Sequence, residues 1–141
     1  MQFNKSLKLV GVFISLLVVI SVFTGCGGTV SEETKIENVI NDCFLAMSNQ
    51  EWDKARGYSI YNSNFYDFVL DLEDIVNNAN LDHKYTLEVF FTIDEIAING
   101  NYATVNGSIL FIETMDGEVW EGVDEEETLY LEKINNIWKL F

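Results

Sequence analysis

The chain has 141 residues, a length suited to one domain with a single hydrophobic core. Its 23 acidic residues outnumber eight lysines and arginines, which gives a formal net charge of −15. This charge argues against nucleic acid as a partner, because phosphate binding requires basic side chains, and against an anionic membrane surface, which would repel the domain.

The N-terminal segment, residues 1–25, has the pattern of an export signal. Lys5 and Lys8 precede an uncharged apolar stretch of fifteen residues, 9–23. A membrane span needs about 20 apolar residues, whereas an export signal combines a basic start, a shorter apolar core and small residues at the cleavage site. The segment therefore predicts a cleaved signal peptide, and an uncleaved signal anchor is the alternative.

The residues that end this segment, Thr24-Gly25-Cys26, resemble the lipobox of bacterial lipoproteins. That family usually has leucine three residues before the cysteine, where this chain has Phe23. The resemblance implies cleavage just before Cys26 and transfer of a diacylglyceryl group to its thiol. Two acyl chains are enough for stable anchoring, whereas one chain is marginal. We therefore expect a lipid-anchored protein at the extracytoplasmic face of the cell membrane, attached through Cys26.

The part that remains after cleavage is more acidic than the whole chain. Residues 26–141 contain six basic residues and all 23 acidic ones, which gives a net charge of −17. Residues 26–33 are mostly small and polar and are expected to form the lipid-anchored tether, and residues 34–141 a single domain. An acidic surface most often serves solubility, and it also attracts basic partners such as a cationic peptide or protein.

Three helices are predicted in the first half of the domain. The first begins at a cap, either Ser31 or Thr34, and a short second helix falls in "EWDKARGYS". The third is capped by Ser63 or Asn64 and should stop within the stretch from Asn77 to Asn80. Apolar residues recur at helical spacing in the first helix, at Ile36, Val39, Ile40, Cys43, Phe44 and Met47, and in the third, at Phe65, Phe68, Val69, Leu72, Ile75 and Val76.

Cys43 falls on the apolar stripe of the first helix. We therefore expect it to be a small buried hydrophobic residue and not a nucleophile. With Cys26 acylated, Cys43 has no partner in the chain, so the domain is expected to lack a disulfide.

The hydrophobic period changes from helical to two at Tyr85, which predicts strands over the rest of the chain. Turns are predicted at Asn99-Gly100, Asp116-Gly117 and Asn135-Asn136. The third strand either continues through the acidic residues 124–127 or restarts after them, and residues 137–141 form the closing strand. Three helices followed by four or five antiparallel strands indicate an α+β fold with the helices on one face of a curved sheet.

Three sequence segments carry a resemblance that covers nearly all of this domain. "NQEWDKA", "IAINGNYATVNGSI" and the last strand "NNIWKLF" look like the nuclear transport factor 2-like superfamily, whose cystatin-like, cone-shaped fold wraps a curved sheet around helices. The resemblance implies a cavity between helices and sheet. Isomerases, cyclases, dehydratases and non-catalytic binders of that superfamily all use this cavity, so the fold does not settle function.

No residue of the chain matches a catalytic base of that superfamily, so no catalytic residue is predicted. His83, the single histidine, lies in a polar link and is expected at the surface. Most aromatic residues should fill the core, but Tyr58, Tyr61 and Trp120 are candidates for the mouth of a ligand cavity.

The acidic residues 124–127, with Asp116 and Glu118 on adjacent loops, are the best candidate for a calcium site. The spacing of a calcium-binding loop is missing, so a solvated acidic turn is the favoured interpretation, and no metal or cofactor is predicted.

Two functional hypotheses from different classes follow. The first is a non-catalytic binding module for a small molecule, a peptide or a basic protein. The alternative is a small-molecule enzyme, isomerase-like or cyclase-like, that uses a cavity carboxylate such as Asp67, Glu88 or Asp94. An acid that points into the cavity with a raised pKa would favour the enzyme.

Overall fold

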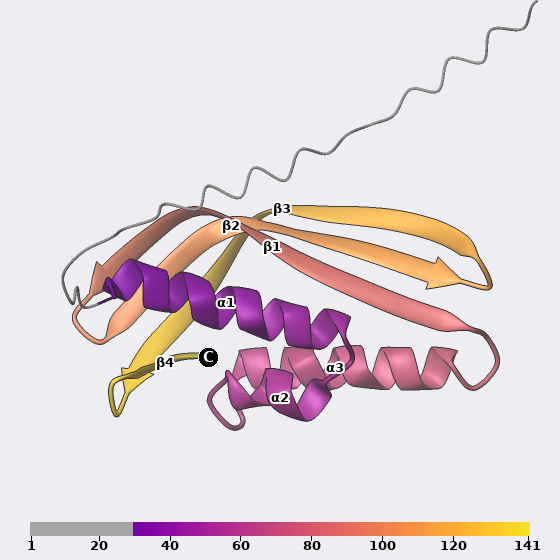
Figure 1. The fold of residues 1–141 in the computed structure, drawn as a ribbon, viewed down its shortest axis with the longest axis horizontal. Coiled ribbons are helices and arrows are strands. Elements are labelled where there is room, and N and C mark those ends of the chain that lie inside the picture. The colour runs from indigo at the N-terminus through magenta and orange to yellow at the C-terminus, as the bar shows by residue number, and fades with distance from the viewer. Residues whose placement is uncertain (1–29) are drawn as a thin grey trace, which may run out of the picture.

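The structure, a computed structural model, describes residues 30–141 apart from the side chains of residues 124 and 125. The predicted signal peptide, the lipidation site Cys26 and the first part of the tether lie outside the described residues. Three helices precede an antiparallel sheet of four strands, so the predicted α+β class and the order of elements are confirmed. In Figure 1 the sheet arches over the helices, which lie along its inner face.

Helix α1 runs from Glu32 to Ser48 and is capped by Ser31, whose Oγ accepts a hydrogen bond from the backbone N–H of Thr34 at 3.2 Å. Of the two predicted caps, Ser31 is therefore the right one. Glu32 and Glu33, expected in the tether, form the first helical turn, where acidic side chains complement the helix dipole. The predicted apolar stripe is buried, except that Val39 is only partly so.

Helices α2, Trp52–Gly57, and α3, Asn64–Ala79, follow. Ser63 caps α3 by accepting from Tyr66 N–H at 3.2 Å. The helix ends at Ala79, within the stretch from Asn77 to Asn80 where it was predicted to stop, and the side-chain amide of Asn80 donates to the carbonyl of Val76 at 2.9 Å. Ile75 was predicted in the core but is 53% exposed. The buried face of α3 consists of Phe65, Val69, Leu72 and Val76.

The sheet is an antiparallel meander in which each strand pairs with the next along the chain. The three predicted turns are confirmed, and the third strand is continuous, so the acidic residues 124–127 lie inside a strand and not in a turn. The last strand is short and pairs only with residues 131–134 of its neighbour. The strands are β1, Tyr85–Asn99; β2, Tyr102–Met115; β3, Glu118–Ile134; and β4, Ile137–Leu140.

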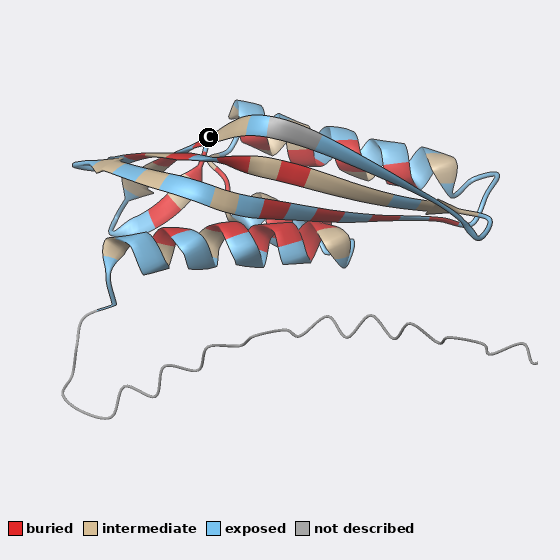
Figure 2. Cartoon of the chain, turned by 90° about the horizontal axis from the view of Figure 1, so that it is seen from above, coloured by how far each residue is buried: buried red, intermediate tan, exposed pale blue. Residues whose placement is uncertain are grey.

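The core lies between the helices and the inner face of the sheet. Figure 2 shows the buried residues of α1 facing the strands, with exposed residues on its other side. Leu131 of β3 and Leu140 of β4 are fully buried there, together with Ile36 and Met47 of α1. No helix within residues 30–141 has both the length and the apolar character needed to cross a membrane.

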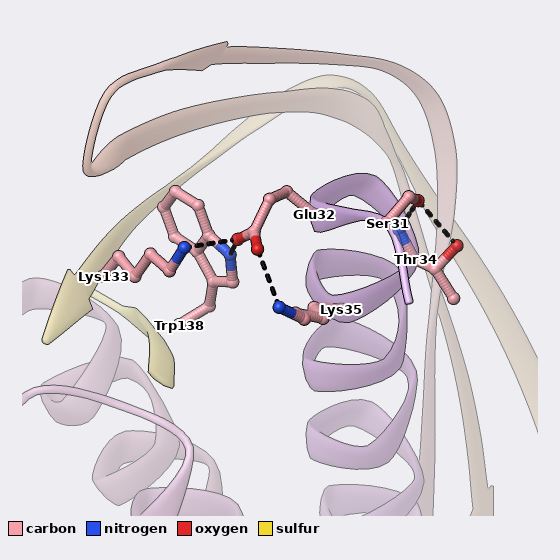
Figure 3. A network of polar contacts seen from close by, with 6 residues as sticks. All are labelled: Ser31, Glu32, Thr34, Lys35, Lys133 and Trp138. Atoms are coloured by element: carbon pink, nitrogen blue, oxygen red, sulfur yellow. Dashed lines mark hydrogen bonds and ion pairs between the residues drawn. The ribbon is translucent and has the colours of Figure 1, made fainter. Parts of the chain in front are cut away.

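The start of α1 is joined to the closing hairpin by a cluster of polar contacts around Glu32 (Figure 3). The Glu32 carboxylate lies 2.7 Å from the ammonium groups of Lys35 and Lys133, and it accepts a hydrogen bond from Trp138 Nε1–H at 2.8 Å. The Lys133 ammonium also lies 5.6 Å from the centre of the Trp138 ring. The bonds from Lys133, Lys35 and Trp138, in that order of effect, lower the pKa of Glu32 to about 2.

Two β-bulges meet in the middle of the sheet. In β1 the extra residue is Asp94, because Ile93 pairs with Gly107 while Glu95 pairs with the adjacent Asn106. In β3 two residues face a single residue of β2, since Gly107 pairs with Glu127 and Ile109 with Asp124. Bulges bend strands and increase their twist, which explains the arch of the sheet at this point.

Gly107 lies between these bulges and is required by close packing. A Cβ atom at this position would come within 2.0 Å of the Thr92 carbonyl oxygen and 2.8 Å of the Phe91 ring. The Phe91 ring therefore occupies the space that a side chain at position 107 would need.

We predict that Glu32→Gln lowers the free energy of unfolding more than Glu33→Gln does. Both variants remove one charge from the first turn of α1, but only Glu32 holds Lys133 and Trp138, while Glu33 is exposed. The folded-state pKa of Glu32 is depressed from 4.5 to about 2. Its stabilising effect is therefore complete above about pH 4.5 and is lost as the pH falls towards 2. Urea unfolding of the wild type and both variants at several pH values measures this, and equal losses for the two variants would contradict it.

We also predict that Gly107→Ala lowers the free energy of unfolding by about 3 kcal/mol, at the upper end of what overpacking usually costs. The carbonyl of Thr92 is backbone and cannot rotate away from the new methyl group. The control is Gly122→Ala on β3, where an added Cβ meets no atom within 4 Å. This control should change stability by less than about 1 kcal/mol. Thermal or urea unfolding compares the two, and equal stability of the two variants would show that the close approach is absent.

Candidate functional site

A cavity of about 360 Å³ lies between the beginning of α3 and the inner face of the sheet. This volume is in the range of sites that hold small molecules. Its walls come from α3, β2, β3 and the residue after β4. The lining residues are Asn64, Phe65, Phe68, Ile109, Phe111, Glu127, Thr128, Leu129, Tyr130 and Phe141.

The aromatic walls of the cavity are held in place by neighbouring rings. The ring of Phe65 lies 6.2 Å from that of Phe44, in the core, and 5.6 Å from that of Phe68. On the other side the ring of Phe141 lies 6.1 Å from that of Tyr130, and Phe141 N–H donates to the Tyr130 carbonyl at 3.0 Å. The cavity therefore has one wall supported by the core and one supported by the pairing at the end of β4.

Among the described residues that line the cavity, Glu127 is the one that carries a charge. It is half-buried and opposes Gly107, and the strand alternation places it on the same face of β3 as Leu129. Within residues 30–141, no ion pair includes Glu127. The hydroxyl of Thr128 is already engaged, because it donates to the side-chain oxygen of Asn106 at 3.0 Å. The cavity is thus mostly apolar with one carboxylate that has no internal counter-charge.

The three residues predicted at the mouth of a ligand cavity do not line this one. Tyr61 is 74% exposed, and its ring packs edge-on against Tyr66 at 5.2 Å. Trp120 is 47% exposed and pairs with Glu113, further out along the β2–β3 hairpin than Phe111. Tyr58 packs against the core.

The actual walls include Phe65, Phe68 and Phe111, which the sequence assigned to the core because core and cavity walls have the same apolar pattern. Phe141 and Glu127 were missed as well. Phe141 was placed in the closing strand, but the strand ends at Leu140, and the ring that follows it reaches the cavity.

None of the three carboxylates predicted as alternative bases reaches the cavity. Asp67, Glu88 and Asp94 are all exposed. Glu88 points outward because its neighbours Leu87 and Val89 occupy the inner face of β1. The single carboxylate in the cavity wall, Glu127, belongs to the acidic stretch that was interpreted as solvated.

His83 is exposed at the surface, as predicted, and does not line the cavity. Its Nδ1 lies 2.8 Å from Asp116 Oδ2, and the backbone N–H of Lys84 donates to Asp116 Oδ1 at 2.9 Å. The backbone bond from Lys84 and then the contact with His83 lower the pKa of Asp116. These contacts join the α3–β1 loop to the turn between β2 and β3.

The acidic residues considered for calcium do not converge. Asp116 and Glu118 lie at the far end of the β2–β3 hairpin, whereas residues 124–127 lie six or more positions along β3. An extended strand rises about 3.3 Å per residue, so Glu118 and Asp124 are about 20 Å apart. The expectation that they share adjacent loops is wrong. In the described part of the chain, no group of three or more His, Cys, Asp or Glu side chains is placed to hold a metal ion.

Within the described residues, two titratable side chains are buried in the core, and neither lines the cavity. Cys43 is fully buried, as predicted, with its thiol donating to the Ala55 carbonyl at 3.5 Å. Burial raises the pKa of Cys43 to about 12. Burial, followed by the nearby Glu113 carboxylate, raises the pKa of Tyr85 to about 12. Both groups are therefore protonated at neutral pH, which leaves Cys43 without the thiolate that a nucleophile requires.

No protein-family model and no curated protein matches the sequence. Solved structures do match. An NTF-2-like protein of unknown function from Shewanella oneidensis has 19% identity and a TM-score of 0.57, over 78% of this chain and 94% of that one. A ketosteroid isomerase-like protein from Erwinia carotovora atroseptica has 15% identity and a TM-score of 0.58, over 79% and 92%.

A third match is a protein of unknown function with a cystatin-like fold from Nostoc punctiforme, with 9% identity and a TM-score of 0.58, over 82% of this chain and 90% of that one. These likenesses establish the fold alone. The domain has the nuclear transport factor 2-like, cystatin-like architecture, and that part of the sequence-based resemblance is confirmed.

Proposed function

We propose that this protein is a lipoprotein anchored through Cys26 at the extracytoplasmic face of the cell membrane, and that its domain is a non-catalytic module that binds a small ligand. The cavity between α3 and the sheet is the proposed binding site. The ligand is mostly apolar, because the lining is mostly apolar.

The observation that supports this function best is the composition of the cavity wall. Seven of its ten residues are aromatic or aliphatic, and one is charged. Sites for small molecules are typically concave and apolar with a few polar groups that orient the ligand. In the described part of the chain, Cys43 and Tyr85 are the two side chains whose pKa is raised to about 12, and both lie in the core and do not line the cavity.

The proposal that the protein is anchored rests on the sequence. The basic start, the apolar stretch and Thr24-Gly25-Cys26 together have the order of a lipoprotein signal. A domain with so negative a surface gains little from anionic lipid headgroups, so lipid chains are the attachment that suits it.

A second candidate function is a small-molecule enzyme that uses Glu127 as a base. The observation that favours it is the position of this carboxylate in the cavity wall. Proton transfer also requires a donor placed opposite the base, and the hydroxyl of Thr128 is engaged with Asn106. Tyr130 is half-exposed at the rim beside Phe141 and is the one remaining hydroxyl in the lining. We favour binding over catalysis, because one carboxylate and one free hydroxyl are fewer groups than an acid–base active site commonly uses.

For the anchor, we expect the full-length protein made in a bacterial host to incorporate an alkyne-labelled fatty acid and to sediment with membranes. Cys26→Ser should lose the label, because no other thiol lies at the predicted cleavage site. The matched control is Cys43→Ser, which should keep the label. Labelling that persists in Cys26→Ser would contradict the proposal.

For the cavity, we expect native mass spectrometry of the full-length protein extracted from membranes to show an added small-molecule mass that unfolding releases. Ile109→Trp should abolish the added mass, because residue 109 lines the cavity and a larger side chain fills it. Leu110→Trp is the control, since Leu110 is the next residue of the same strand and points to the opposite face. Thermal unfolding checks that both variants are folded. A bare mass for the wild type, or equal binding by both variants, would contradict the proposed site.

A further inference from the structure

We propose that the ligand of this cavity is a cation: a small amine or quaternary ammonium compound whose apolar part fills the cavity and whose charged group lies beside Glu127. This inference rests on the proposed binding function and narrows it to one chemical class. Three features of the molecule lead to it, namely the rings in the wall, the unpaired carboxylate and the location of the basic residues.

The walls suit an organic cation. Five aromatic rings line the cavity, from Phe65, Phe68, Phe111, Tyr130 and Phe141. The face of an aromatic ring carries a negative quadrupole that attracts ammonium groups, and clusters of such rings recognise quaternary ammonium ligands. The same rings accept neutral apolar ligands, so the rings alone do not decide the class.

Glu127 decides it. A half-buried carboxylate beside an apolar wall keeps its charge at lower cost when an opposite charge lies next to it. In the described chain, no ion pair satisfies Glu127. A cationic ligand would supply that partner, whereas a carboxylate or phosphate ligand would be repelled.

The basic residues of the domain are committed elsewhere. Of the six within residues 30–141, five have acidic or carbonyl partners away from the cavity, and the sixth, Lys84, lies in the α3–β1 loop. None of them lines the cavity. These five residues make the following contacts: Lys35 and Lys133 with Glu32, Lys54 with Glu51, Arg56 with Asp53 and Glu73, and Lys139 with the Gly57 carbonyl.

One feature opposes the proposal. The N-terminus of α3 reaches the cavity at Asn64, and a helix N-terminus carries roughly half a positive charge, which favours anions. However, Asp67 in the first turn of α3 provides a full negative charge, and the Ser63 hydroxyl already binds the N–H of Tyr66. With Glu127 added, the local balance at the cavity is negative.

The test compares three water-soluble probes of nearly the same shape: 3-phenylpropylammonium, 3-phenyl-1-propanol and 3-phenylpropionate. They carry a positive charge, no charge and a negative charge. Binding to the full-length protein in dodecyl maltoside micelles, whose headgroup carries no charge, is measured by ligand-observed NMR, with empty micelles as the blank. We expect the ammonium probe to bind at least tenfold more tightly than the alcohol, and the carboxylate probe to bind most weakly.

The matched variants are Glu127→Gln and Glu121→Gln. Both remove one negative charge from β3, but Glu121 is exposed and pairs with Ile112, on the outer face. Glu127→Gln should bring the ammonium probe and the alcohol within about threefold of each other, and Glu121→Gln should keep the tenfold preference. Thermal unfolding checks the folding of both, and if Glu127→Gln does not fold, the ranking of the three probes on the wild type remains decisive.

The outcomes separate this inference from the proposed function. Equal binding of the ammonium probe and the alcohol, or a preference that survives Glu127→Gln, would overturn the cationic ligand while leaving a binding cavity in place. If none of the three probes binds, the cationic ligand is overturned as well, and the added mass in native mass spectrometry then decides whether binding itself stands.

Discussion

The bend of the sheet at Gly107 is the constraint on which the rest of this structure depends. Two bulges meet there, one on each side of β2, and the missing side chain lets the ring of Phe91 lie across the strand. A flat sheet would pack poorly against α1 and α3. Helices pack well on a sheet whose strands twist and curve around them. The same bend places Glu127 opposite Gly107, so the geometry that shapes the sheet also positions the carboxylate of the cavity.

Two regions of the domain use charge in opposite ways. At the end where α1 begins, Glu32 is shared by two lysines and a tryptophan, and opposite charges are matched within the protein. In the cavity wall, Glu127 has no basic neighbour among the described lining residues. An internal ion pair contributes to folding and leaves little for a partner to recognise, whereas an unmatched carboxylate in an apolar wall has its full charge available for an interaction.

The sequence predicted the elements well because each rests on a local pattern. Helical spacing, caps such as Ser31 and Ser63, and turn residues such as Asn99-Gly100 act over a few positions and require no knowledge of the fold. The cavity could not be predicted from such local patterns. A ring such as Phe68 has the same periodicity whether it faces another side chain or an empty space, and that depends on the three-dimensional arrangement of α3 and β2. The position of Glu127 on the inner face could not be predicted for a further reason. The bulge in β3 interrupts the alternation of inner and outer residues next to it.

The position of β4 in the core has a consequence for how the chain acquires its structure. Trp138 is almost fully buried and bonds to Glu32, 106 residues earlier in the sequence, while Leu140 pairs with the segment after α2. The helices therefore lack a complete surface to pack on until this last strand is present. We therefore expect the cooperative folding step to require these contacts of high sequence separation. Late completion of the core would be compatible with the export that we propose for this chain, since an exported polypeptide crosses the membrane before it folds.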